Sequence, residues 1–192
     1  MIKVSQRVYK KDEVAFFFRV KEPFGRLSNM ASGMPIFVAT DTDTIFTPSS
    51  EALYQAARFP SSVECQKKII EAKSGFAAKL ESKPYREGFT RPDWEDVKVN
   101  VMRWAIGLKL HQNPSTFGAE LLSTGDKPIV EKSSKDQFWG CFQIGDEFVG
   151  CNVLGRLLME LRQQYVEQGE SYKPPSVLPL DVVILGQKVI DF

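Results

Sequence analysis

The sequence predicts an α+β fold, a predominantly α-helical single domain with a small antiparallel β-sheet. Three observations lead to this class. From Phe59 onward apolar residues recur at helical spacing, short aromatic and β-branched runs stand near both ends of the chain, and no repeat or linker divides it. A chain of 192 residues with 43% hydrophobic content can form one substantial core. We therefore expect a single domain over residues 1–192.

The strands are expected ahead of the helices and at the end of the chain. Aromatic and β-branched residues predict short strands at 13–20, 35–39, 44–47 and 182–190. Pro23-Phe24-Gly25 predicts a turn, and the aperiodic residues 26–30 predict an ordered loop. We expect the last strand to pair with the first, so that the two ends of the chain form the sheet.

The first helix is predicted over residues 47–59. Thr47 suits the N-cap, Pro48 suits the first helical position, and Glu51 lies in the first turn, where the helix dipole favours a carboxylate. One face of this helix carries Glu51, Tyr54, Gln55 and Arg58. Such a polar row fits either a solvated surface or one wall of a polar pocket, and the helix alone leaves both open.

Further helical segments follow, and capping residues or prolines mark most of their starts. We expect them to begin at Ser61 or Ser62, Phe76, Asp93, Asn113-Pro114 and Asn152. The clearest apolar stripes consist of Val97, Val101, Ala105 and Leu108 in one segment and Leu154, Leu157, Leu158, Leu161 and Tyr165 in the last.

Composition argues against several kinds of site and location. The net charge of +1 gives no overall attraction to nucleic acid or membranes, although a local basic patch stays open. Three scattered cysteines and a single histidine, His111, do not favour a Cys/His metal site, and we expect no metal and no cofactor. Free thiols, together with the lack of a signal peptide or a membrane-spanning run, predict a cytoplasmic protein.

Carboxylates are the remaining candidates for proton transfer. His111 lies at a predicted helix end, where histidine commonly caps carbonyls, and the usual phosphate-loop, dinucleotide and metalloprotease motifs are absent. Asp136 precedes Phe138-Trp139-Gly140, where apolar rings could raise its pKa for use as an acid, or it could simply organise a turn. Trp94 and Trp139 could stack on a heterocycle or belong to the core.

A phosphate site has plausible parts near the last helix. Asn152 begins a helix whose free N–H groups attract anions, and Arg156 follows one turn later. The alternative is an ordinary N-cap followed by a surface arginine. Lys79 and Lys98 could likewise be solvated.

Nine segments of the chain stand out when they are taken together. They include Pro-Phe-Gly-Arg-Leu-Ser-Asn (23–29), Ser-Glu-Ala-Leu-Tyr-Gln-Ala (50–56), Arg-Pro-Asp-Trp-Glu-Asp-Val-Lys (91–98), Asp-Gln-Phe-Trp-Gly (136–140) and Gly-Cys-Asn-Val-Leu-Gly-Arg-Leu-Leu-Met-Glu-Leu-Arg (150–162). In order and spacing they resemble the NADAR family, also called YbiA-like, over about residues 16–165. Residues 166–192 form a C-terminal extension beyond the resemblance.

The resemblance implies a hydrolase that cleaves the N-glycosidic bond between ribose and a base. One branch of the family acts on early pyrimidine intermediates of riboflavin synthesis and releases ribose 5-phosphate, and this is the activity we expect. Another branch removes ADP-ribose from guanine in nucleic acid, and a non-enzymatic ADP-ribose-binding module is a third possibility. The expected partner is a small phosphorylated ribose compound, with modified nucleic acid as the alternative and no membrane.

The resemblance also implies a set of site residues. Glu51 and Asp136 correspond to the catalytic carboxylates. The expected pocket is lined by Gly25, Asn29, Tyr54, Lys79, Trp94, Trp139, Asn152 and Arg156. The polar row of the first helix then becomes a pocket wall. One carboxylate would stabilise the positive charge that develops on the ribose, and the other would assist the leaving base or activate water.

Overall fold

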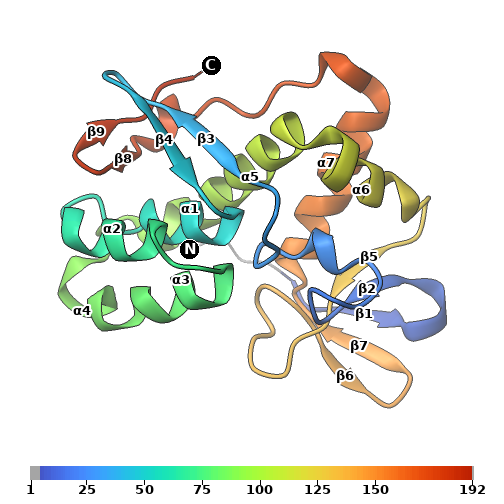
Figure 1. Cartoon of the computed structure of the whole chain (residues 1–192). Helices are drawn as coiled ribbons and strands as arrows, with labels where there is room; N and C mark the ends of the chain where they lie inside the picture. Colours follow the sequence, from blue (N-terminus) through green and yellow to red (C-terminus); the bar gives the residue numbers. More distant parts are fainter. Residues whose placement is uncertain (1–4, 192) are drawn as a thin grey trace. The chain divides into compact units, whose positions relative to one another are not determined.

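A computed structural model describes residues 5–191, which form two compact units. Residues 29–113 and the C-terminal segment that begins at Lys173 make unit 1, whereas residues 5–28 and 114–172 make unit 2. Both units combine helices with small sheets (Figure 1), which confirms the predicted α+β class. That the whole chain acts as one domain stays a prediction.

Unit 1 contains a β-hairpin, a group of helices and a shorter C-terminal hairpin. Its elements are β3 (Ile36–Ala39), β4 (Thr44–Thr47), α1 (Ser50–Ala56), α2 (Val63–Ile70), α3 (Gly75–Ser82), η3 (Lys83–Tyr85), α4 (Arg86–Phe89), α5 (Trp94–Gln112), η6 (Leu178–Leu180), β8 (Val183–Ile184) and β9 (Gln187–Lys188). β3 and β4 pair antiparallel, as predicted. Helix α1 packs against α2, α3 and α5, so it lies at the centre of this unit.

Three of these helices begin with a serine N-cap. Side chains of Ser49, Ser62 and Ser74 accept hydrogen bonds from backbone N–H groups three residues later, at 3.2, 3.4 and 3.1 Å. Ser62 is one of the two caps predicted for α2. The prediction of Thr47 as the cap of α1 is wrong, because Thr47 ends β4 and its hydroxyl donates to the carbonyl of Ile36 at 3.1 Å. Helix α1 therefore starts later than expected.

Unit 2 contains a three-stranded antiparallel sheet, a parallel strand pair and the last long helix. Its elements are β1 (Arg7–Lys10), η1 (Lys11–Glu13), β2 (Ala15–Phe17), η2 (Gly25–Leu27), the π-helix η4 (Pro114–Gly118), α6 (Ala119–Ser123), β5 (Ile129–Glu131), β6 (Phe142–Ile144), β7 (Glu147–Gly150), α7 (Val153–Gln168) and η5 (Gly169–Ser171). The sheet order is β1-β7-β6. Val14, Val130, Cys141 and Phe148 form a buried cluster in this unit.

The expected pairing of the two chain ends is wrong. The N-terminal strand β2 pairs in parallel with β5, and the C-terminal residues form the antiparallel hairpin β8–β9. Leu185 and Gly186, between the two short strands, have φ values of 53° and 80°. Two successive left-handed residues reverse the chain, so residues 182–190 cannot form one continuous strand.

Asp93 and Asn152 occupy the predicted N-cap positions, but neither side chain caps its helix. The carboxylate of Asp93 accepts hydrogen bonds from the guanidinium of Arg91 at 2.6 and 2.8 Å. The amide of Asn152 bonds to strand β5 instead. Among the described residues, no helix is both long and apolar enough to cross a membrane.

Candidate active site

Glu51 is a carboxyl group enclosed by the protein. It lies in the first turn of α1 and is only 2% exposed. Its oxygen Oε1 accepts a hydrogen bond from Nε2 of Gln55 at 2.8 Å, and Oε2 accepts one from Nδ2 of Asn29. The backbone supports this arrangement, since the carbonyl of Asn29 accepts from the N–H of Glu51 at 3.0 Å. Two neutral amides therefore orient both oxygens, and all residues of α1 are buried.

Burial raises the pKa of Glu51 above its ordinary value, because the charged form loses its hydration. The ammonium of Lys79 opposes this rise, as do the hydrogen bond from Gln55, the charge of Arg86 and the hydrogen bond from Asn29. The net result is a carboxyl group that holds its proton to higher pH than a solvated glutamate. A shifted pKa in a buried, oriented carboxyl group is common at catalytic sites.

Gln55 leaves one hydrogen-bonding position open beside Glu51. Its Nε2 is used by Glu51, but its Oε1 is buried and accepts no hydrogen bond within the described residues. The side chain is only 3% exposed, so solvent does not supply the missing donor freely. A buried acceptor without a donor is costly, and a water or a ligand hydroxyl would satisfy it.

Positive charge surrounds the Glu51 carboxyl group. Lys79 on α3 and Arg86 at the start of α4 both lower its pKa by their charge. Arg58, just beyond α1, lies within electrostatic range of Arg86, whose charge together with burial lowers the pKa of Arg58. Unit 1 thus has two cations that act on a single buried carboxyl group and a third, Arg58, that interacts with one of them.

The predicted aromatic residues of unit 1 are in contact. The rings of Tyr54 and Trp94 lie 4.9 Å apart with their planes tilted by 50°. The guanidinium carbon of Arg58 lies 5.4 Å from the centre of the Trp94 ring. Trp94 is only 3% exposed, so its ring contributes to the packing of α1 against α5. Its assignment as a substrate-binding residue stays a prediction.

Gly25 has a structural reason to be glycine. A Cβ atom there would lie 2.3 Å from the carbonyl oxygen of Val20 and 2.6 Å from that of Arg19. No larger residue fits so close a backbone approach. The glycine therefore shapes the segment that leads to η2 in unit 2.

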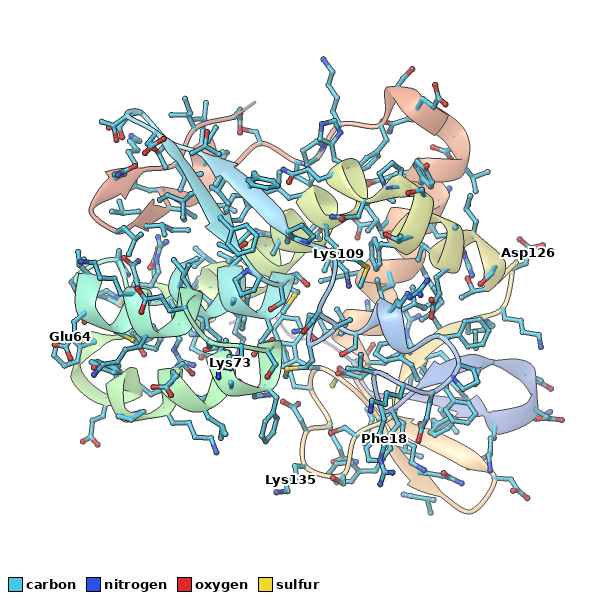
Figure 2. All side chains as sticks on the ribbon, viewed as in Figure 1. Phe18, Glu64, Lys73, Lys109, Asp126 and Lys135 are labelled. Atoms are coloured by element: carbon cyan, nitrogen blue, oxygen red, sulfur yellow. The ribbon has the colours of Figure 1, made fainter. Side chains whose placement is uncertain are left out.

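Asp136 in unit 2 organises a turn. Its Oδ1 accepts hydrogen bonds from the N–H groups of Phe138 and Trp139, both at 2.9 Å, while its own N–H donates to the hydroxyl of Ser133 at 3.0 Å. Within the described residues, Oδ2 accepts no hydrogen bond. The turn-forming role considered for Asp136 is thus present, and its catalytic role stays a prediction. Lys135 beside it is exposed (Figure 2).

The start of α7 does not offer the expected free N–H groups. The N–H groups of Asn152, Val153 and Leu154 donate to the carbonyls of Gly140, Phe138 and Trp139, at 3.2, 3.0 and 3.0 Å. A loop of unit 2 therefore engages the N–H groups of Val153 and Leu154, and the substrate-binding role of Asn152 stays a prediction.

Asn152 has instead a structural role in unit 2. It is fully buried, its Nδ2 donates to the carbonyl of Ile129 at 2.8 Å, and its Oδ1 accepts from the N–H of Glu131 at 3.1 Å. Its φ of 50° is left-handed, a conformation that asparagine tolerates better than most residues. Asn152 thus joins α7 to β5.

Arg156 on α7 is the predicted site residue of unit 2 that keeps an unused donor. Its Nη1 is buried and has no hydrogen-bond partner within the described residues. Trp139 is half-buried, with its ring 5.2 Å from that of Phe138 and almost perpendicular to it.

The sequence analysis missed Arg86 and did not single out Gln55 and Arg58 as site residues. Gln55 and Arg58 could have been selected, because they share the predicted helix face with Glu51. Arg86 gave no signal, since it stands in a four-residue helix that no periodicity reveals. Among the described residues, no group of three or more His, Cys, Asp and Glu side chains could hold a metal ion.

The sequence and the structure were both compared with those of known proteins, and the matches agree with one another. A family model described as the NADAR domain matches residues 16–165. The chain is 34% identical over 158 residues to the N-glycosidase YbiA of Escherichia coli, a match that covers 80% of this chain and 89% of that protein. The NMR structure of E. coli YbiA is similar, with a TM-score of 0.65 and 32% identity, over 83% of this chain and 88% of that one.

Longer relatives carry a different name. The chain is 36% identical over 156 residues to a riboflavin biosynthesis protein of Vibrio vulnificus, which covers 81% of this chain. The match spans 40% of the length of that protein and 24% of a chloroplastic riboflavin biosynthesis protein of Zea mays.

Proposed function

Because the chain belongs to the NADAR family, we propose that it is an N-glycosidase that cleaves the bond between ribose and a nitrogen base. The observation that carries the proposal is the Glu51 carboxyl group, which is buried, oriented by two amides and raised in pKa. A binding module would have no need of such a group.

The reaction needs what Glu51 offers. When the bond between C1′ and nitrogen breaks, its electron pair leaves with the base, and positive charge develops on the ribose. A nearby carboxylate stabilises that charge. Water supplies the hydroxyl that remains on C1′ and, in the net reaction, the proton that the base takes up. A carboxyl group of raised pKa is suited to accepting a proton from the attacking water.

Glu51 is therefore proposed as the group that faces C1′ and the water. The unpaired Oε1 of Gln55 is a further acceptor for that water or for a ribose hydroxyl. Asp136 is proposed as the second carboxylate on the strength of the family resemblance. Its Oδ1 is engaged in the turn, so Oδ2 would be the oxygen that acts.

We further propose that the substrate is a phosphoribosyl pyrimidine intermediate of riboflavin synthesis and that ribose 5-phosphate is released. The names of the Vibrio and Zea relatives support this pathway. The alternative is removal of ADP-ribose from guanine in nucleic acid. A nucleic-acid substrate would need a basic surface track, which lysines 67, 68, 73 and 79 could supply. Lys68 in that set is already paired with Glu64 at 2.8 Å, and Lys79 acts on Glu51.

The test measures product release by the purified full-length chain. We expect ribose 5-phosphate from the pyrimidine intermediates and no ADP-ribose from ADP-ribosylated guanosine. Glu51→Gln should lower kcat by about 10²–10⁴-fold while the variant remains folded. Release of neither product would overturn the proposal, and release of ADP-ribose alone would transfer it to the alternative. Near wild-type turnover by Glu51→Gln would remove Glu51 from the mechanism.

A further inference from the structure

Two arginines in the described part of unit 1 interact electrostatically and have no ion-pair partner. Arg58 follows α1 and Arg86 begins α4, and the side chain of Thr90 links the guanidinium of Arg58 to the backbone of Arg86. The Thr90 hydroxyl accepts a hydrogen bond from Nε of Arg58 at 2.9 Å and donates one to the carbonyl of Arg86 at 2.8 Å. Across the described residues, neither guanidinium forms an ion pair with a carboxylate.

Arg58 is held in one orientation. Besides its bond to Thr90, its guanidinium carbon lies 5.4 Å from the Trp94 ring centre and 5.7 Å from the Phe59 ring centre. Cation–π contacts and one hydrogen bond fix the group and, among the residues that the structure describes, use only its Nε donor. The donors of its two terminal nitrogens remain for a ligand.

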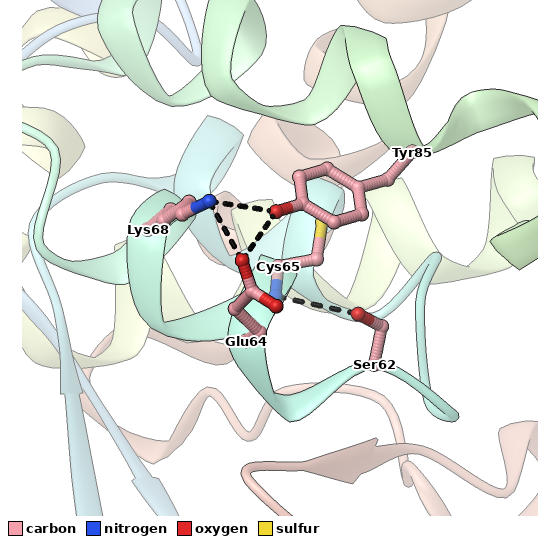
Figure 3. Close-up of polar contacts among 5 residues, drawn as sticks. All are labelled: Ser62, Glu64, Cys65, Lys68 and Tyr85. Atoms are coloured by element: carbon pink, nitrogen blue, oxygen red, sulfur yellow. Dashed lines mark hydrogen bonds and ion pairs between the residues drawn. The ribbon is translucent and has the colours of Figure 1, made fainter.

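Arg86 is anchored by the residue before it. The hydroxyl of Tyr85 donates to Glu64 at 3.1 Å and accepts from Lys68 at 2.8 Å, which attaches the start of α4 to α2 (Figure 3). Nε of Arg86 is buried and has no hydrogen-bond partner in the part of the chain that the structure describes. A buried guanidinium donor without an acceptor is unfavourable, and an anionic oxygen would satisfy it.

The charges near these arginines favour a bound anion. Lys79 and Arg86 both act on Glu51, Arg86 acts on Arg58, and Glu95, which also acts on Arg58, is already paired with Lys98. Burial disfavours the ionised form of Glu51, so it compensates these cations poorly. Like charges held together at partly buried positions repel each other, and a bound dianion relieves this repulsion.

We infer that Arg58 and Arg86 form a phosphate-binding site beside Glu51, whose ligand is the phosphomonoester of a phosphorylated ribose. Guanidinium groups recognise phosphate through parallel N–H donors, and two of them match a doubly charged group better than the singly charged phosphates of a diphosphate. The inference rests on the proposed function, since it assigns the phosphate of the proposed substrate. It also supplies a phosphate site in place of the N–H groups at the start of α7, which are occupied.

The test compares ligand binding by the full-length chain and its variants in calorimetry. The variants are Arg58→Gln and Arg86→Gln, with Arg7→Gln, an exposed arginine of β1, as the matched control. We expect each of the first two to weaken ribose 5-phosphate binding by at least about tenfold, with ribose binding unchanged. Arg86→Lys should recover part of the loss, and Arg7→Gln should bind as the wild type does. Thermal unfolding checks that the variants are folded.

Several results would overturn the inference. They are unchanged ribose 5-phosphate affinity in both variants, an equal loss of ribose affinity, and a loss confined to ADP-ribose, which would indicate a diphosphate site. If Arg156→Gln removes the preference for ribose 5-phosphate over ribose, whereas Arg58→Gln and Arg86→Gln do not, the phosphate site lies in unit 2. Binding requires no turnover, so the two proposals fail separately. If no N-glycoside is cleaved but binding still depends on both arginines, only the proposed function is lost.

Discussion

Glu51 is a residue whose ionisation the fold makes costly. A glutamate that is 2% exposed loses most of its hydration, and two neutral amides and nearby cations restore only part of it. Such a group opposes stability when it is charged. Its retention at the centre of unit 1 is understandable if it serves chemistry, because active sites commonly sacrifice stability for function.

The first prediction concerns stability and pH. The pKa of Glu51 is higher in the folded chain than its ordinary value of 4.5, so between these two pKa values the folded state binds more protons than the unfolded state. Wild-type stability therefore falls as pH rises through that window and stays lower above it. Glu51→Gln cannot ionise, and a rotated Gln55 amide could accept from the new side chain. The variant should gain stability relative to the wild type as pH rises from 4 to 8.

Urea unfolding of both proteins across this pH range measures the effect. Glu64→Gln is the control, because Glu64 is exposed and its pKa is lowered by Lys68 and Tyr85. Its difference from the wild type should change in the opposite direction. A stability difference for Glu51→Gln that is independent of pH would show that Glu51 does not titrate as described.

The second prediction concerns Gln55, which we regard as a positioning residue. The hydrogen bond from its Nε2 lowers the pKa of Glu51, so Gln55→Leu should raise that pKa further. The limb of the kcat/KM profile that reports Glu51 should then move to higher pH, and kcat should fall because the carboxyl group loses one of its two orienting amides. A lower rate with an unmoved pH profile would indicate a merely structural role.

At the scale of elements, the sequence predicts best what local interactions decide. The start of α2 follows from its serine cap, that of α5 from apolar periodicity, and the strands β3 and β4 from β-branched residues within a few positions. The three-stranded sheet was missed, because its strands are only three or four residues long and β1 pairs with β7 across most of the chain, although β6 and β7 form a local hairpin. Such pairings are decided by tertiary contacts and leave little local pattern.

The candidate site divides in the same way. Glu51 and Asn29 were predicted from motif segments, and the structure joins them by a hydrogen bond. Asn152 was predicted as a phosphate-binding N-cap, but its side chain bonds to the backbone of β5. The sequence does not reveal this partner, because β5 is distant from Asn152 along the chain. Arg86 depends on how α4 is anchored to α2, which likewise no local pattern could reveal.

The third prediction tests the start of α1, the element that carries Glu51. Ser49 is 1% exposed, and its hydroxyl accepts from the N–H of Ala52, so Ser49→Ala should destabilise the protein by about 1 kcal/mol. Ser61→Ala is the matched control, because Ser61 is exposed and Ser62 caps α2. Chemical denaturation of both variants makes the comparison. Equal stability of the two would place the cap of α1 elsewhere.

At the scale of the whole molecule, each unit is assembled from stretches far apart in the sequence. The C-terminal segment lies beyond the family match, yet its Val177, Val182, Ile184 and Val189 are at most 2% exposed. Residues with so little exposure belong to the core of unit 1. The part of the extension from Lys173 onward is therefore a structural part of the unit that holds Glu51.

The fourth prediction tests this connection at Gln66 on α2. This side chain is fully buried, and its Nε2 donates to the carbonyls of Ala56 and Val183 at 3.0 and 2.8 Å, while its Oε1 accepts from the N–H of Leu185 at 2.7 Å. It therefore joins the end of α1 to the β8–β9 hairpin. Gln66→Leu leaves buried backbone groups without partners and should cost about 3 kcal/mol. The loss should come with faster hydrogen exchange at the amide of Leu185.

The same substitution at an exposed helical position, Gln163→Leu on α7, separates this effect from the general consequence of replacing glutamine by leucine. In the described part of the chain the Gln163 side chain bonds only to the nearby Glu167, so its replacement should change stability by less than about 0.5 kcal/mol. If Gln66→Leu costs no more than this control, the hairpin is held by its apolar residues alone. If it costs several times more while Leu185 exchanges faster, the C-terminal extension depends on Gln66 for its attachment to α1. If Gln66→Leu also lowers activity, the loss would then be explained by a disturbed end of α1, the helix that carries Glu51 and Gln55.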